Sequence, residues 1–258
     1  MIKKIISILS ISAAVSLNAA AVSQDQCIDK GDEFIYAGGE CIEYRVFEGD
    51  GDAINIIVHG TWPDGANTLG RYGPFAETIN FSTDLTTIAV ALPGYSGSST
   101  NNFTALAHEG VKNLGAKKEY VEFLGDLVQA LKDRYEAKTV NYIGHSAGAM
   151  MGATLTGLRP GLISNAHLVG GRYDIQAETG NKNLISMSNV LSNIKDTNYT
   201  FVYGTADKIS LPQTTISFYD VVKKAGLNAT LVEVKGAEHV DLDMTTPSVE
   251  AFAKMVKN

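Results

Sequence analysis

Residues 139–155 read TVNYIGHSAGAMMGATL, and the pattern Gly-x-Ser-x-Gly lies in the middle, at Gly144, Ser146 and Gly148. An apolar run that is partly β-branched precedes the pattern, and small and apolar residues follow it. This order predicts a strand, a tight turn and a helix. The two glycines let the strand and the helix approach each other without clashes between Cβ atoms. The pattern is typical of a nucleophile elbow, a turn that exposes a serine at its tip.

The helix expected after Ser146 would direct its first N–H groups, and the positive end of its dipole, at the serine hydroxyl. When a serine attacks a carbonyl group, the carbonyl oxygen becomes an oxyanion that needs hydrogen-bond donors. The N–H of Ala147, the residue directly after the serine, is therefore a candidate for one of these donors.

The first 21 residues have the composition of a secretory signal peptide. Lys3 and Lys4 form a basic start, residues 5–17 are mainly apolar, and the alanines at 19–21 offer a cleavage site. A membrane anchor is the alternative, but the run is short for a bilayer span, which takes about 20 residues. We expect cleavage after Ala21 or nearby, no stable membrane insertion afterwards, and a periplasmic or secreted protein.

Charge and length limit the classes of function. Loss of the two leader lysines would change the formal net charge from −7 to −9. An acidic chain without basic clusters argues against a nucleic-acid partner. Residues 22–258 are enough for one sizeable domain.

The chain has two cysteines, Cys27 and Cys41, both just after the predicted leader. In an oxidising compartment the expected state of such a pair is a disulfide bond. A metal pair or a catalytic thiol is the alternative. Neither cysteine has metal-ligating residues close by in the sequence, so we expect no metal site here.

Strand and helix patterns alternate along the chain, which indicates an α/β fold. The predicted strands span residues 34–36, 41–47, 53–58, 86–92, 139–143, 165–169, 200–204 and 230–234. The predicted helices span residues 72–80, 119–135, 147–155, 210–226 and 246–256. The interval of about 174–198 has room for one or two short helices. We expect a small cap there and an open site for bulky or polymeric substrates.

Three residues with complementary chemistry stand at predicted strand ends, in the order Ser146, Asp207 and His239. Serine is a weak nucleophile and needs a base within hydrogen-bond reach. Histidine supplies that base near neutral pH, and a carboxylate orients the histidine. Asp174 also follows a predicted strand and is an alternative acid. Of the other histidines, His108 is expected at the surface.

The motifs together resemble the α/β-hydrolase superfamily, in its serine branch. They are HG at 59–60, PGYSG at 93–97, GHSAG at 144–148, GTAD at 204–207 and GAEH at 236–239. The resemblance extends over essentially all of the mature chain. It implies a mostly parallel sheet of about eight strands with helices on both faces, an acyl-serine intermediate, and no metal or organic cofactor.

The resemblance also implies a second oxyanion donor after the HG motif, which would be the backbone N–H of Thr61. Three ring-bearing residues are candidates for contact with substrate: Trp62, Tyr95 and His145. Trp62 could equally pack within its loop. The expected function is hydrolysis of a small-molecule or polymeric carboxylic ester. A peptidase, a thioesterase and a non-catalytic binding protein on the same fold are the alternatives.

Overall fold

The structure, a computed structural model, describes residues 21–257, so the predicted leader lies outside it except for Ala21. Its centre is an eight-stranded sheet with the strand order β1-β2-β4-β3-β5-β6-β7-β8. The strands are β1 (Phe34–Ala37), β2 (Glu40–Phe47), β3 (Ala53–Val58), β4 (Thr86–Val90), β5 (Thr139–His145), β6 (Asn165–Val169), β7 (Asn198–Gly204) and β8 (Ala229–Val234). β2 pairs antiparallel with β1 and β4, and all other pairs are parallel. The predicted α/β fold with a mostly parallel sheet is confirmed.

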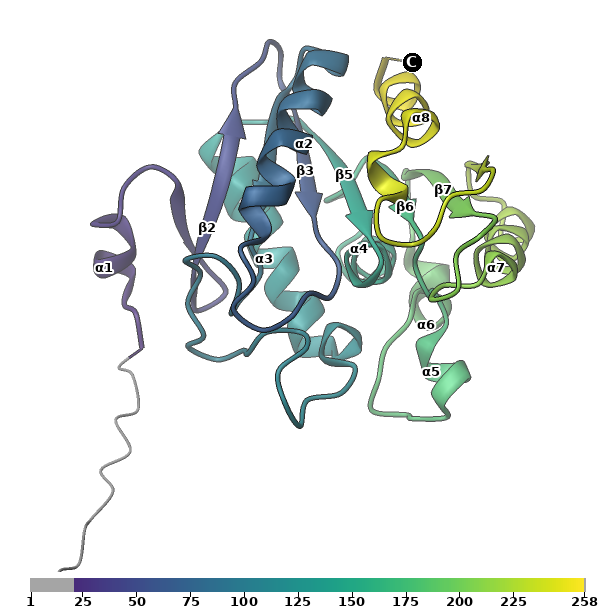
Figure 1. Cartoon of the computed structure of the whole chain (residues 1–258), viewed down its shortest axis with the longest axis horizontal. Helices are drawn as coiled ribbons and strands as arrows, with labels where there is room; N and C mark the ends of the chain where they lie inside the picture. Colours follow the sequence, from purple (N-terminus) through teal and green to yellow (C-terminus); the bar gives the residue numbers. More distant parts are fainter. Residues whose placement is uncertain (1–20, 258) are drawn as a thin grey trace, which may run out of the picture.

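Helices cover both faces of this sheet. Figure 1 shows α2 and α8 together on one face, and α3 and α4 on the other. The α-helices are α1 (Gln24–Ile28), α2 (Thr68–Thr83), α3 (Lys118–Arg134), α4 (Ala147–Leu158), α5 (Ile175–Thr179), α6 (Met187–Val190), α7 (Pro212–Lys224) and α8 (Thr246–Lys257). Three short 3-10 turns are η1 (Leu114–Ala116), η2 (Leu191–Asn193) and η3 (Leu242–Met244). Among residues 21–257, no helix is both long and apolar enough to cross a membrane.

The helix predicted at residues 72–80 is longer than expected, because α2 begins at Thr68 and runs through Pro74. Its start is set by Asn67, whose side-chain oxygen accepts a hydrogen bond from the Gly70 N–H at 2.9 Å. Proline inside a helix removes one backbone hydrogen bond and usually disrupts it. Here the helix buries Leu69 and other large side chains against the sheet, and this burial offsets the loss.

A line of asparagine amides crosses the amino-terminal end of the parallel strands. Each side-chain nitrogen donates to the side-chain oxygen of the next residue, over 2.7–2.9 Å, in the order Asn228, Asn198, Asn165, Asn141 and Asn55. The line ends at Asn55, whose amide donates to the hydroxyls of Thr83 and Thr87. A slip of one residue between strands would turn these side chains to the other face of the sheet, so this asparagine ladder stabilises the observed register.

The first helix is attached to the antiparallel edge of the sheet. Cys27 of α1 and Cys41 of β2 form a disulfide bond, as predicted.

At the other side of the molecule, the interval 174–198 contains two short helices, α5 and α6, followed by η2. Figure 1 shows this interval below the carboxyl ends of the parallel strands, where the site described next is located.

Candidate active site

Ser146 lies at the turn between β5 and α4, with φ at 54° and ψ at −115°. A positive φ is uncommon and strained for a residue with a side chain. The turn is also tightly packed. A Cβ atom on Gly148 would collide with the carbonyl oxygen of Val58, and one on Gly60 would lie 2.7 Å from the Cβ of Ser146. Both glycines are therefore required for the strand, the helix and the loop after β3 to meet around the serine.

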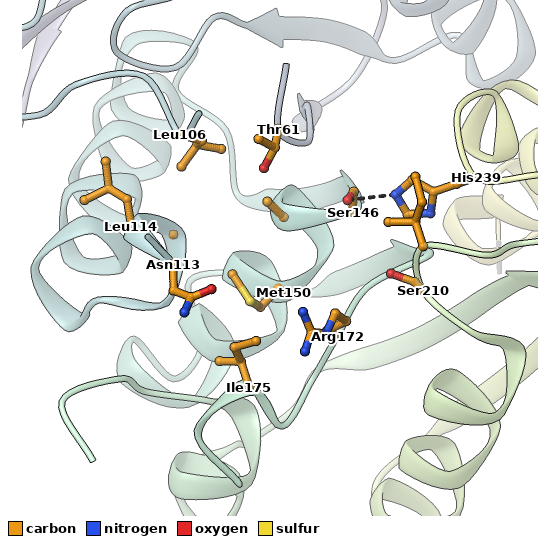
Figure 2. A pocket seen from close by; sticks show the side chains of 13 residues that line it. Thr61, Leu106, Asn113, Leu114, Ser146, Met150, Arg172, Ile175, Ser210 and His239 are labelled. Carbon is orange, nitrogen blue, oxygen red and sulfur yellow. Dashed lines mark hydrogen bonds between the residues drawn. The ribbon is translucent and has the colours of Figure 1, made fainter. Parts of the chain in front are cut away.

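The structure brings the predicted serine, histidine and aspartate into one line of hydrogen bonds. His239 Nε2 lies 2.9 Å from Ser146 Oγ (Figure 2). On the other side of the imidazole ring, His239 Nδ1 lies 2.7 Å from Asp207 Oδ2. Because a carboxylate only accepts hydrogen bonds, Nδ1 carries the proton and Nε2 is free to accept from the serine hydroxyl. The three side chains are arranged for proton transfer from the serine to the histidine.

The buried carboxylate of Asp207 is fixed from two sides. Its Oδ1 accepts hydrogen bonds from the backbone N–H groups of Ile209 and Ser210, at 2.8 and 2.9 Å. We expected Ser210, the first residue of the predicted segment 210–226, to cap the next helix. The cap residue is Leu211 instead, and α7 starts at Pro212. Asp174, the alternative acid, is occupied elsewhere: its Oδ1 accepts from the Ser188 hydroxyl.

His59, at the end of β3, holds the loop that carries Thr61. The Leu92 N–H donates to His59 Nε2 at 3.1 Å, so the proton lies on Nδ1, which is 2.7 Å from the Gly60 carbonyl oxygen. The imidazole is completely buried, and this burial lowers the pKa of His59 to about 4. His59 is therefore neutral at neutral pH, and its two hydrogen bonds hold the Gly60–Thr61 turn in place.

Two backbone N–H groups are available beside the serine. Thr61 and Ala147 both line the cavity that contains Ser146. Within residues 21–257, neither N–H donates a hydrogen bond to another group of the protein. Unpaired N–H groups next to a serine can bind an oxygen atom that gains negative charge during a reaction.

The cavity around Ser146 and His239 has a volume of about 380 Å³. Apolar side chains form much of its wall, and the full lining is Thr61, Leu106, Asn113, Leu114, Gly115, Ser146, Ala147, Met150, Arg172, Ile175, Ile209, Ser210 and His239. Sequence analysis missed most of this lining. Met150 could have been found, because it lies one helical turn after Ser146. Asn113 and Arg172 come from irregular segments whose approach to the serine depends on the tertiary structure.

The three ring-bearing residues expected to contact substrate do not line this cavity. Tyr95 is buried, and its hydroxyl donates to the carbonyl oxygen of Trp62 at 2.9 Å. The Trp62 indole ring packs under the guanidinium group of Arg71, at 5.0 Å. The Trp62 side chain thus packs against Arg71 of α2 and does not line the cavity.

His145 is also buried, directly behind the catalytic candidates. Its Nε2 lies 2.8 Å from the backbone carbonyl oxygen of His239, and its Nδ1 lies 3.3 Å from the Tyr72 hydroxyl. The carbonyl can only accept, so Nε2 carries the proton. His145 therefore supports the loop of His239 and faces away from the cavity, which corrects its expected role as a substrate contact.

The two remaining histidines lie outside the site. His108 is about half exposed, and its Nδ1 is 2.6 Å from Asp64 Oδ2. His167 is buried in β6, with Nε2 2.9 Å from the Ser248 hydroxyl. Burial lowers the pKa of His167 to about 3. Among residues 21–257, no group of three or more histidine, cysteine, aspartate or glutamate side chains could hold a metal ion.

Comparison with solved structures finds a similar fold in other proteins. An esterase of Pyrococcus furiosus superposes with a TM-score of 0.64 at 16% identity, covering 84% of this chain and 87% of its own. Est1E of Butyrivibrio proteoclasticus, with ferulic acid bound, gives 0.63 at 14% identity, covering 87% and 99%. A serine hydrolase without a lid from Xanthomonas campestris gives 0.62 at 13% identity, covering 84% and 88%. At such identities the likeness concerns the fold.

A search of curated protein sequences finds no match to this chain. The family model of the α/β-hydrolase fold, in contrast, matches residues 55–207, which include most of β3, the Gly-x-Ser-x-Gly turn and Asp207. Since this match spans more than half of the chain, the protein belongs to the α/β-hydrolase fold family.

Proposed function

We propose that this protein is a serine hydrolase that cleaves carboxylic esters through an acyl-serine intermediate. The observation that carries the proposal is the continuous line of hydrogen bonds from Asp207 through His239 to Ser146. In this proposal Ser146 is the nucleophile, His239 is the base and then the acid, and Asp207 orients the histidine.

The first half of the reaction follows from these positions. Ser146 Oγ bonds to the ester carbonyl carbon while its proton moves to His239 Nε2. The carbonyl oxygen takes up the electron pair and is bound by the N–H groups of Thr61 and Ala147. When the carbon–oxygen bond to the alcohol breaks, the same proton passes from His239 to the leaving oxygen. The acyl group stays on Ser146.

The second half uses a water molecule in place of the serine. His239 takes a proton from the water, whose oxygen bonds to the acyl carbon. The bond to Ser146 Oγ then breaks, and His239 returns the proton to the serine. The products are the free acid and the regenerated enzyme, with atoms and charge in balance.

Esters are the preferred substrates for two reasons. The cavity beside Ser146 has a volume of about 380 Å³ and several large apolar side chains in its wall, which suits the acid part of a simple ester. One of the similar structures is an esterase, and another, Est1E, has ferulic acid bound, which is an aromatic carboxylic acid. Feruloyl esters therefore belong in the first test panel, beside short-chain p-nitrophenyl esters.

The test combines a label for the nucleophile with substrate turnover. A fluorophosphonate probe should label the wild type and fail to label Ser146→Ala. The wild type should hydrolyse at least one of the p-nitrophenyl, feruloyl and polyester substrates. Labelling together with turnover of aminoacyl amides or thioesters alone would favour a peptidase or thioesterase. Absence of both labelling and turnover would favour a non-catalytic binding protein.

We also propose that the site has no large lid. The interval 174–198 contributes only short elements, which are α5, α6 and η2, and the similar Xanthomonas campestris structure is a serine hydrolase without a lid. Activity on a short-chain ester should rise smoothly as its concentration passes the solubility limit. A sharp increase only above that limit would show that a lid opens at the lipid–water interface.

Export is the remaining part of the proposal. The sequence of residues 1–21 and the Cys27–Cys41 disulfide both fit an oxidising compartment outside the cytoplasm. Mass spectrometry of protein taken from the periplasm or the medium should find a mature chain that starts at Val22 or close to it, with the two cysteines linked. Retention of the leader, or two free thiols in that material, would contradict export in this form.

A further inference from the structure

Two polar side chains of the cavity, Asn113 and Arg172, lie apart from Ser146 and His239 (Figure 2). Five lining side chains are large and apolar: Leu106, Leu114, Met150, Ile175 and Ile209. Asn113 and Arg172 add hydrogen-bond donors to this apolar wall. Among the described residues that line the cavity, Arg172 is the one with a permanent charge, and no carboxylate is present. A ligand that fills the cavity would thus meet apolar surface and a cationic group together.

Arg172 follows β6, and Figure 2 shows its guanidinium group directed into the cavity, between Met150 and Ile175. Glu178 of α5 holds the group on one side. The Arg172 Nε–H donates to Glu178 Oε2 at 2.7 Å, and Nη2 contacts the same oxygen. Nη1 has no hydrogen-bond partner among residues 21–257. One edge of the guanidinium is therefore anchored, and the other edge is free for a ligand.

The pair with Glu178 does not cancel the attraction for a second anion. The side chains of Arg172 and Glu178 are 45% and 30% exposed, so water screens their interaction. An arginine can bind carboxylates along more than one edge, because its five N–H donors form a planar fork. A ligand carboxylate at Nη1 would lie closer to the positive charge of the guanidinium group than to the carboxylate of Glu178.

Asn113 offers a second donor to the same ligand. It is exposed, lines the cavity, and lies in the left-handed backbone region with φ at 52°. Its side-chain amide makes no hydrogen bond to the rest of the described chain. Asparagine tolerates this left-handed backbone conformation better than most residues do. With the loop in this conformation, the Asn113 amide lies at the cavity.

From these positions we infer that the preferred ester carries a carboxylate at a distance from the bond that is cleaved, and that Arg172 is the residue that selects it. This inference rests on the proposed esterase function and names its substrate class. The selectivity depends on binding, because Arg172 does not contact Ser146 or His239. Its removal should therefore change KM more than kcat.

The acid part or the alcohol part of the ester could bear the carboxylate, so the test has two arms. In the first, mono-p-nitrophenyl adipate is compared with p-nitrophenyl hexanoate, which has the same chain length and no charge. In the second, 4-carboxyphenyl hexanoate is compared with phenyl hexanoate. The measured quantity is the ratio of kcat/KM for the anionic ester to kcat/KM for the neutral ester.

Arg172→Gln should lower this ratio about fivefold in one arm, and Arg172→Lys should restore part of it. Glu178→Gln should raise the ratio, because it removes the competing carboxylate. Arg134→Gln removes a surface arginine with the same change in net charge and should leave the ratio unchanged. The wild-type ratio should fall in 0.5 M NaCl, since salt screens the attraction.

The outcomes separate this inference from the proposed function. If the neutral esters are hydrolysed but Arg172→Gln leaves both ratios unchanged, the esterase proposal stands and the selection of a carboxylate is wrong. An equal loss for anionic and neutral esters would also overturn it, because it would indicate a purely structural role. If neither ester is hydrolysed and the fluorophosphonate does not react, the proposed function itself fails.

Discussion

The two ends of the parallel strands are built on opposite principles. At the amino-terminal end, each asparagine of the ladder donates a hydrogen bond to the next one across neighbouring strands. Asn55 and Asn141, at the end of the ladder that lies inside the protein, are fully buried. At the carboxyl end, the backbone of Ser146 is strained, and the N–H groups of Thr61 and Ala147 have no partner in the described chain. One end uses its polar groups to hold the sheet together, and the other leaves polar groups available for a ligand.

This difference separates stability from function along one set of strands. Buried polar groups stabilise a fold when all of their hydrogen bonds are made. Groups that bind a reacting oxygen cannot already be hydrogen-bonded to the protein. The carboxyl end is therefore less stable by itself, and the rest of the fold offsets this cost. Substitutions at the two ends should therefore affect different measurements.

The largest expected effect is on catalysis, at the carboxyl end. Ser146→Ala should lower kcat for p-nitrophenyl butyrate on the order of 10⁶-fold, because the nucleophile is lost. Its free energy of unfolding in urea should stay within about 0.5 kcal/mol of the wild type. Substantial turnover by the purified variant would show that another residue attacks the ester.

The next effect tests which acid orients the histidine. Asp207→Asn should lower kcat on the order of 10⁴-fold, because an amide favours the wrong tautomer of His239. Asp174→Asn is the matched control, since Asp174 accepts from Ser188 and makes no contact with His239. A larger loss for Asp174→Asn than for Asp207→Asn would mean that the wrong acid has been assigned.

At the amino-terminal end the effect should be on stability. Asn141→Ala removes the donor to Asn55 Oδ1, which is buried, and should lower the free energy of unfolding by about 2 kcal/mol. The control is Asn198→Ala in the exposed part of the same ladder, which should cost less than about 1 kcal/mol. Both variants should keep the wild-type kcat. A large loss of kcat in Asn141→Ala would show that the two ends are coupled.

The last expected effect concerns the pH dependence of stability. Burial lowers the pKa of His167 to about 3, below the value of about 6.5 in an unfolded chain. Below pH 6.5 the unfolded state binds a proton that the folded state does not, so the stability present above that pH is lost as the pH falls toward 3. Replacing this histidine, as in His167→Asn, should reduce the slope of unfolding free energy against pH by about 1.4 kcal/mol per pH unit between pH 6 and 4.

The asparagine ladder gives the control for this measurement, because amides do not titrate. Asn141→Ala should lower the free energy of unfolding by the same amount at pH 5 and at pH 8. An unchanged slope in His167→Asn would indicate that the buried imidazole takes up its proton in the folded state.

Local sequence was sufficient for most of the elements and for the line of three residues. The strand at 53–58 is an apolar run interrupted only by Asn55, and Gly144 and Gly148 mark a turn that few other residues allow. The start of α2 was missed because proline at position 74 resembles a helix start. Only the packing of α2 on the sheet shows why the helix continues through it.

The contents of the cavity could not be predicted in the same way. Trp62, Tyr95 and His145 are next to the motifs in sequence, yet their side chains turn into the protein and support the loops. Arg172 and Asn113 reach the cavity from segments with no motif of their own. Sequence distance from Ser146 is a poor guide to contact with a ligand, because loops from several strands converge on one end of the sheet.

Sequence by itself determined the order of strands and helices, the tight turn at Ser146 and the chemical types of its partners. These features depend on backbone conformation and residue type over a few positions, which local patterns record. Tertiary structure alone decided that five asparagines join into one ladder and that Arg172 faces the cavity. Each of these features depends on strand register and on the paths of loops between residues far apart in the chain. Packing and hydrogen-bond geometry then determine which of several chemically similar side chains makes the contact.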